Sequence, residues 1–212
     1  MRKATVLGLL VFAGTLASPA FADEFTGFRL ALNLSSERLE GDLFFDPLLA
    51  TESVSGDRFG YGLSAGWALN KWLAFEAGLM GGGDFSDHPF SLASPTDDIV
   101  SRTDVKGGEI SVVGSLWIGR KFAFFGRAGM LAWKADEKVV VTNGATGAKA
   151  SASVDDTGFD PIFGAGIQTV LDGALMRLEY KYTEIGDLGA AGSFNLHDNS
   201  ISSLNFSIVW TL

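Results

Sequence analysis

The last ten residues, Ser203–Leu212, read SLNFSIVWTL and carry the pattern that decides the fold. In this stretch large apolar side chains alternate with smaller and mostly polar ones. A period of two residues is the signature of a β-strand whose two faces meet different surroundings. The first such segment, residues 28–35 (FRLALNLS), repeats the alternation. Both segments are therefore predicted to be strands.

Three pairs of alternating segments lie between these two, and each pair is joined by a short turn. The turns are Asn70-Lys71, Arg120-Lys121 and Asp172-Gly173, and Asp-Gly is a strong hairpin signal. The paired segments are residues 59–69 with 73–80, 110–118 with 122–130, and 163–168 with 176–182. One strand, three hairpins and one closing strand make eight strands.

The other four connections are long and polar, which makes the two ends of the molecule unlike. They are residues 36–57, 84–107, 134–157 and 185–200. Short turns at one rim and long loops at the other are typical of transmembrane β-barrels.

Size decides which phase of the alternation faces outward. The interior of an eight-stranded barrel is just wide enough to be filled by side chains. The Phe, Leu, Ile, Trp and Tyr residues of one phase are too bulky to fit there, whereas the Gly, Ser and Ala of the other phase fit. The bulky phase must then meet lipid, since a large exposed apolar surface otherwise aggregates.

We therefore predict an all-β protein: an eight-stranded antiparallel up-and-down transmembrane β-barrel with three short periplasmic turns and four long extracellular loops. A soluble β-sandwich with ordinary strand aromatics is the alternative.

The N-terminus has the pattern of an export signal. Arg2 and Lys3 precede an uncharged apolar run, and Ala20-Phe21-Ala22 fits the small-x-small pattern of a cleavage site. We expect residues 1–22 to be a signal peptide and residues 23–212 to be the barrel domain, located in the cell outer membrane. A membrane anchor is the alternative, but the apolar run is shorter than the ~20 residues that a spanning helix needs.

Composition excludes several classes of function. The net charge of −9 speaks against nucleic acid as a partner. The absence of cysteine removes disulfides, thiol catalysis and Cys-ligated zinc. His88 and His197 are the only histidines. Both lie in segments rich in Ser and Asp, so finding these residues next to a histidine is expected by chance and does not indicate catalysis. We expect no catalytic residue, no metal and no cofactor.

The acidic residues of the long segments have two interpretations. Asp155, Asp156 and Asp160 could bind Ca²⁺ or Mg²⁺, but their spacing does not match a known calcium loop. We expect these and the other loop carboxylates to form a solvated surface.

Six charged residues fall in the small, inward-facing phase. They are Arg29, Glu76, Arg127, Arg177, Glu179 and Lys181. Charges inside a protein must be paired or neutralised. We therefore predict that these six residues form an ion-pair network in the lumen. A salt-bridged plug is the simplest function of such a network, and a gate or proton path through the same charges is the alternative.

Three stretches carry a resemblance to a known family. They are FGRAG at residues 125–129, GAG at 164–166 followed by RLEY at 177–180, and the alternating C-terminal residues Phe206, Ile208, Trp210 and Leu212. In these stretches the chain from residue 23 to 212 resembles the OmpA-like group of small outer membrane β-barrel proteins, the porin-family barrels. The first two stretches look like the family's fifth to seventh strands. The third looks like its C-terminal signal for the outer membrane assembly machinery.

The resemblance implies an integral outer membrane protein of a Gram-negative bacterium. Two features differ from the family pattern: Leu212 stands where Phe is usual, and we expect no periplasmic domain after the last strand, so peptidoglycan tethering is not implied.

We expect a monomeric, non-enzymatic barrel in contact with outer membrane lipid and lipopolysaccharide. Its role would be envelope integrity or loop-mediated adhesion to an unnamed ligand. A narrow porin-like channel for small solutes is the alternative, and a lipid-modifying barrel enzyme is a third hypothesis.

Overall fold

The computed structural model describes residues 26–45, 50–90, 98–191 and 194–212, so the predicted signal peptide lies outside it. Within these ranges the chain forms nine β-strands. They are β1 (Gly27–Phe45), β2 (Ala50–Ala68), β3 (Leu73–Gly82), β4 (Phe85–Phe90), β5 (Asp98–Ile118), β6 (Phe122–Thr142), β7 (Lys149–Leu171), β8 (Ala174–Ala191) and β9 (Phe194–Thr211). None of the described segments is a helix long and apolar enough to cross a membrane.

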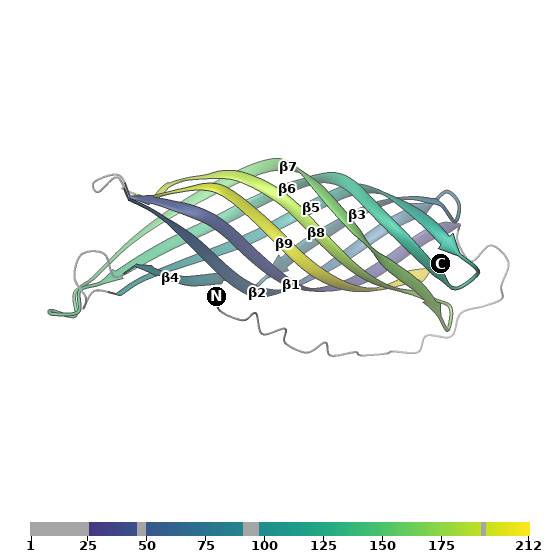
Figure 1. The fold of residues 1–212 in the computed structure, drawn as a ribbon, viewed down its shortest axis with the longest axis horizontal. Helices are drawn as coiled ribbons and strands as arrows, with labels where there is room; N and C mark the ends of the chain where they lie inside the picture. Colours follow the sequence, from purple (N-terminus) through teal and green to yellow (C-terminus); the bar gives the residue numbers. More distant parts are fainter. Residues whose placement is uncertain (1–25, 46–49, 91–97, 192–193) are drawn as a thin grey trace.

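The strands close into a barrel (Figure 1). Strands that follow one another along the chain pair antiparallel, except β3 and β4, which do not pair with each other; β1 also pairs with β9, and β3 pairs with β5. β3 and β4 are successive pieces of one barrel position, because both pair with β5 and only Gly83 and Asp84 separate them. The nine segments therefore make eight barrel strands. The predicted antiparallel up-and-down β-barrel is confirmed.

The three short turns lie where the sequence predicts them. In the β7–β8 turn, Asp172 has φ 48° and Gly173 has φ 81°, the left-handed pair that a tight β-hairpin requires. In the β2–β3 turn, the side-chain oxygen of Asn70 accepts hydrogen bonds from the backbone N–H groups of Trp72 (2.7 Å) and Leu73 (3.0 Å). This Asn side chain replaces backbone partners that the chain reversal removes.

The bulky phase faces outward, as predicted. Leu63 is 64% exposed and Leu79 is 71% exposed, whereas Ala68, Ala74 and Arg127 on the other phase are buried. In an outer membrane barrel such an exposed apolar belt is solvated by hydrocarbon.

The strands extend well beyond the segments that the alternation identifies. β7 has 23 residues and β6 has 21, whereas a strand needs only ~9–11 residues to cross a bilayer. β6 and β7 pair without a break from Phe122↔Thr169 to Thr142↔Lys149, so most of the predicted loop 134–157 is a hairpin. The other three predicted loops also consist largely of strand. Their polar character reflects contact with water, which both paired strands and irregular loops can face.

Apolar side chains fill the barrel at two levels. Near the short turns, Ala68, Ala74, Val113 and Phe125 pack together. Farther toward the loop end lies a larger cluster, here called the upper apolar cluster. It comprises Leu39, Phe85, Val105, Leu131, Trp133, Ala135, Ile162, Ile185 and Ile201. The polar layer described next lies between these two levels.

Candidate functional site: the charged layer of the lumen

Arg127 of β6 is the centre of a buried ion-pair network. Its Nε donates to Oε1 of Glu179 (2.7 Å), its Nη1 to Oε1 of Glu109 (3.0 Å), and its Nη2 to Oε2 of Glu76 (2.8 Å). Nη1 also donates to the hydroxyl of Ser111 (2.7 Å). The three carboxylates come from β8, β5 and β3, so one guanidinium joins strands from several sides of the barrel.

Two further cations extend the network. Arg177 Nη1 donates to Oε1 of Glu76 (2.7 Å), and its Nε donates to Oε1 of Gln168 (3.0 Å). Lys181 Nζ donates to Oε2 of Glu109 (3.0 Å). Glu76 and Glu109 thus each bridge Arg127 to a second cation. Bridged charges of opposite sign offset the cost of removing each one from water.

Glycine on the inward phase gives these long side chains their space. A Cβ atom on Gly164 would lie 2.5 Å from Oε1 of Glu179, and one on Gly66 would lie 2.8 Å from Cγ of Glu76. Both distances are shorter than a van der Waals contact, so a larger residue would push the carboxylates out of the layer. The charged layer therefore depends on glycine at these inward-facing positions, which leaves room for the long charged side chains.

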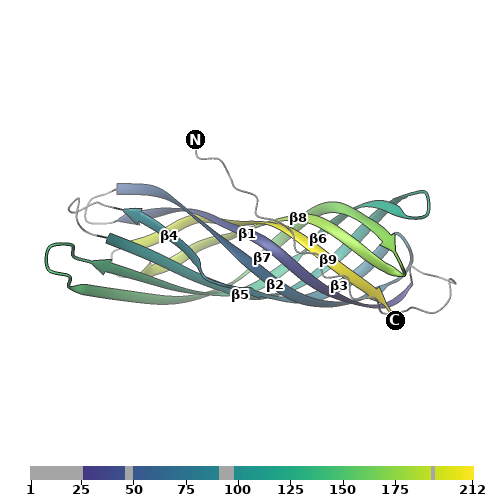
Figure 2. The same cartoon turned by 90° about the horizontal axis from the view of Figure 1, so that it is seen from below.

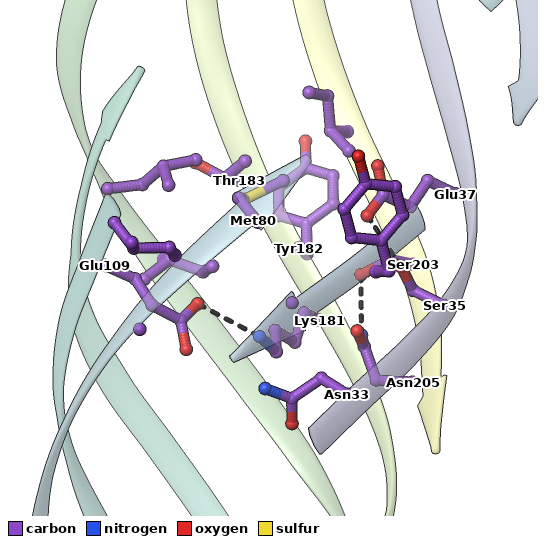
Figure 3. Close-up of a pocket in the computed structure, with 17 residues that line it drawn as sticks. Asn33, Ser35, Glu37, Met80, Glu109, Lys181, Tyr182, Thr183, Ser203 and Asn205 are labelled. Atoms are coloured by element: carbon purple, nitrogen blue, oxygen red, sulfur yellow. Dashed lines mark hydrogen bonds and ion pairs between the residues drawn. The ribbon is translucent and has the colours of Figure 1, made fainter. Parts of the chain in front are cut away.

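A small cavity adjoins the charged layer at Glu109 and Lys181, which both line it (Figure 3). It has a volume of about 30 Å³, and its lining includes Glu109, Lys181 and Asn205 together with Leu131 and Ile162 of the upper apolar cluster. A cavity of this size has room for no more than a few water molecules.

A second buried ion pair lies in the strand extensions. Arg58 of β2 contacts Oε2 of Glu37 through Nη2 (2.6 Å) and Nε (2.7 Å), and the Ser35 hydroxyl donates to the same carboxylate (2.7 Å). The Arg58 guanidinium also lies over the ring of Phe85, 4.2 Å from its centroid. The prediction of a solvated carboxylate at Glu37 is therefore wrong.

The structure brings five of the six predicted lumen residues into direct contact with the network. They are Glu76, Arg127, Arg177, Glu179 and Lys181. The sixth, Arg29, is buried with Arg177 and Glu76 among its charged neighbours.

Sequence reasoning missed Glu109, which lies one residue before the predicted strand 110–118. Its phase, shared with Ser111, is the signal that could have identified it as inward-facing.

Two more of the loop acids have protein partners. Asp160 accepts a hydrogen bond from the indole Nε1 of Trp133 (2.6 Å). Asp155 lies 3.5 Å from Nζ of Lys134 and is exposed. Among the described residues, no group of three His, Cys, Asp or Glu side chains is arranged to hold a metal ion. The side chains of His88 and His197 lie outside the described set.

The four residues of the predicted assembly signal lie on β9 and just after it. Phe206, Ile208 and Trp210 are partly exposed on the outward phase, and Leu212 is 75% exposed. Their positions pair with the equally apolar outward residues of β1, as in Leu30↔Trp210. The predicted signal residues therefore lie along the pairing that joins the last strand to the first.

Comparison with known proteins gives consistent results. A family model described as the OmpA-like transmembrane domain matches residues 35–211. Outer membrane protein A of Shigella flexneri is 28% identical over 153 residues, which is 71% of this chain and 40% of that protein. Outer membrane protein A of Klebsiella pneumoniae is 29% identical over 153 residues, which is 71% of this chain and 41% of that protein. The chain thus spans less than half the length of these relatives.

Among solved structures, the outer membrane protein OprG from Pseudomonas aeruginosa has a similar fold. It superposes with a TM-score of 0.54 at 11% identity, over 88% of this chain and 98% of that one. Since the family model covers most of the chain, this protein belongs to the OmpA-like transmembrane domain family and is an integral outer membrane β-barrel protein.

Proposed function

We propose that the protein is a closed, non-conducting and non-enzymatic barrel that stabilises the outer membrane and presents its strand extensions at the cell surface. The observation that carries this proposal is the Arg127 network. A guanidinium held by three carboxylates from three strands fills the lumen with fixed charges that bind one another.

A permeating ion would have to break this network. It would lose its hydration shell in a space of about 30 Å³ and then pass the upper apolar cluster. Removing an ion from water without a compensating partner is strongly unfavourable. The layered interior therefore supports a plug over a gate or proton path.

Planar-bilayer recording of the purified protein tests the proposal. We expect no steady conductance from the wild type. An Arg127→Ala variant should show more frequent brief openings, because it removes the cation that three carboxylates share. Arg38→Ala is the matched control, since Arg38 forms an exposed pair with Glu40 (2.8 Å) and should change nothing. A steady, large wild-type conductance would instead indicate a narrow channel for small solutes.

The non-enzymatic part of the proposal has its own test. We expect the purified protein to leave phospholipid and lipid A intact. Hydrolysis or transfer by the wild type that is lost in His88→Ala or His197→Ala would show a lipid-modifying enzyme.

For partners, we propose outer membrane lipid and lipopolysaccharide around a monomeric barrel, and the outer membrane assembly machinery for β9. The alternation that ends in Trp210 and Leu212 supports the second partner. Exchanging Phe206 and Ile208 for Ser should lower the folded fraction in cells more than in refolding from urea. Equal effects in both assays would indicate that these side chains act in barrel stability alone.

A further inference from the structure

One edge of β7 has a partner strand for only part of its length. β6 pairs with β7 over its whole length, out to Lys149. On the other side, β8 pairs with β7 only from Leu171 to Ile162. Within the described residues, the stretch 149–161 of β7 therefore has an open edge with no paired strand.

The sequence explains why β7 and β8 separate at this point. Pro161 has no backbone N–H, so it cannot donate to the ladder. Its carbonyl accepts a hydrogen bond from the side chain of Thr183 (2.8 Å), which ends the pairing. Beyond Thr183, β8 follows β9 with three register shifts between Glu184 and Ala191. Figures 1 and 2 show the β6–β7 hairpin, in green, projecting at the loop end apart from β1 and β9.

The backbone groups on this edge can be assigned by their alternation. The N–H of Val170 donates to the carbonyl of Lys121, on the side of β6 (2.9 Å). Backbone groups of successive strand residues point to opposite sides, and the pairing with β6 has no register shift. The odd-numbered residues of β7 therefore direct N–H and C=O toward the open edge. Six residues do so above Pro161: Lys149, Ser151, Ser153, Asp155, Thr157 and Phe159.

This edge has charged side chains at Lys149 and Asp155 but lacks the backbone features that prevent pairing with another chain. Natural edges are protected by charged side chains, by proline, by a bulge or by a very short strand. Residues 149–160 contain no proline, and their pairing with β6 is regular. A row of evenly spaced donors and acceptors is complementary to an extended peptide backbone.

We propose that the open edge of β7, residues 149–159, binds an extended peptide segment of another protein as an added antiparallel β-strand. The inference rests on the proposed surface-presenting role, because the edge must be accessible outside the cell.

The outward side chains define the peptide that fits. Phe159 is 59% exposed near the apolar belt, the Asp155 side chain is 69% exposed, and Lys149 is exposed at the tip. An antiparallel partner would run away from the membrane. It would place an apolar residue beside Phe159, Lys or Arg four residues later beside Asp155, and an acidic residue six residues further beside Lys149. Nζ of Lys134 lies 3.5 Å from Oδ2 of Asp155, so Lys134 would compete with the basic residue of the peptide for this carboxylate.

The experiment uses the full chain in lipid nanodiscs and the synthetic peptide LTVTKTVTVTE, with LTVTETVTVTK as the charge-exchanged control. Residue-resolved amide hydrogen exchange by NMR is the measurement. We expect the first peptide to slow exchange at the odd-numbered amides from Ser151 to Phe159. The control should bind about tenfold more weakly, since two exposed attractions become repulsions.

Variants separate edge pairing from other modes of binding. Ser153→Pro removes one open-edge N–H and leaves the ladder with β6 intact, so it should abolish peptide binding while the barrel keeps its heat-modifiable gel mobility. Ser153→Ala keeps the N–H and should bind like the wild type. Should Ser153→Pro fail to fold, Ser151→Pro provides the same test.

Three results would overturn the inference: no protection of the edge by the peptide at millimolar concentration, wild-type affinity in the folded proline variant, or protection of the edge without peptide. Protection of the edge without peptide would mean that something else covers it. If that protection requires lipopolysaccharide, the lipid is the occupant; if it increases with protein concentration, a second copy of the chain is the occupant. Conductance is read separately, so failure of the closed-barrel proposal is distinguishable from failure of this one.

Discussion

Replacing Arg127 by Ala should destabilise the barrel by about 3–5 kcal/mol, the usual cost of removing one partner from a buried ion-pair network. The side chain makes four hydrogen bonds, three of them to carboxylates at 2.7–3.0 Å. Removing it leaves those three acidic groups inside the lumen. The free energy of unfolding falls because each acid has lost a hydrogen-bonded cation at a buried position.

The three carboxylates do not lose the same share of their cationic partners when Arg127 is removed. Glu76 keeps its contact with Arg177 at 2.7 Å, and Glu109 keeps Lys181 at 3.0 Å. Among the described residues, the ion pair of Glu179 is with Arg127 alone. We therefore expect the double variant Arg127→Ala with Glu179→Gln to recover part of the lost stability. Recovery of this kind would show that the stranded charge of Glu179, rather than a lost packing contact, causes most of the effect.

Equilibrium unfolding in urea, followed by tryptophan fluorescence in lipid vesicles, measures these differences. Arg38→Ala is the control, because Arg38 and Glu40 form an exposed pair whose loss should cost less than about 1 kcal/mol. The reasoning is refuted if Arg127→Ala costs no more than Arg38→Ala, or if the Glu179→Gln change makes the loss larger.

Three other substitutions test the packing of the lumen, one turn and the lipid-facing surface. Gly158→Ala would place a Cβ 2.3 Å from Cζ2 of Trp133 and should cost about 1–3 kcal/mol with a shift in near-ultraviolet circular dichroism; an unchanged spectrum would contradict this packing. Gly173→Val, at φ 81°, should cost about 1–2 kcal/mol, and a neutral effect would argue against the left-handed turn. Leu79→Arg should reduce insertion into vesicles by about 2–4 kcal/mol if Leu79 faces the bilayer centre, whereas normal insertion would place it outside the hydrocarbon.

The alternation of the sequence was sufficient to predict the barrel and its outward face. Residues such as Leu63 and Leu79 repeat at a period of two, and their bulk permits only one assignment of inside and outside. The turn at Asp172-Gly173 was equally predictable, since its chemistry favours left-handed backbone angles.

The length of the strands could not be predicted in the same way. In the stretch that includes Ser36 and Asp57, polar residues occur on both phases, and an irregular loop in water has the same composition. Pairing partners decide between the two, and β1 pairs with β2 as far as Phe45↔Ala50. Composition carries no information about that pairing.

The contacts within the charged layer also could not be predicted from the sequence. Phase alone places Glu76, Arg127 and Glu179 inside the barrel. Which of them touch depends on the register between strands and on side-chain length. The same limit explains the missed pair of Glu37 and Arg58, whose residues lie in a segment predicted to be a loop.

The most direct test of the central claim is a lipid-accessibility scan along β6. The chain has no cysteine, so single cysteines can be introduced from residue 123 to 131, labelled with a fluorophore and quenched by brominated lipid. We predict strong quenching at the even-numbered positions, which face outward, and protection at the odd-numbered ones, which include Arg127. Quenching with no period of two, or with the opposite phase, would contradict a barrel whose bulky face meets lipid and whose charges fill the lumen.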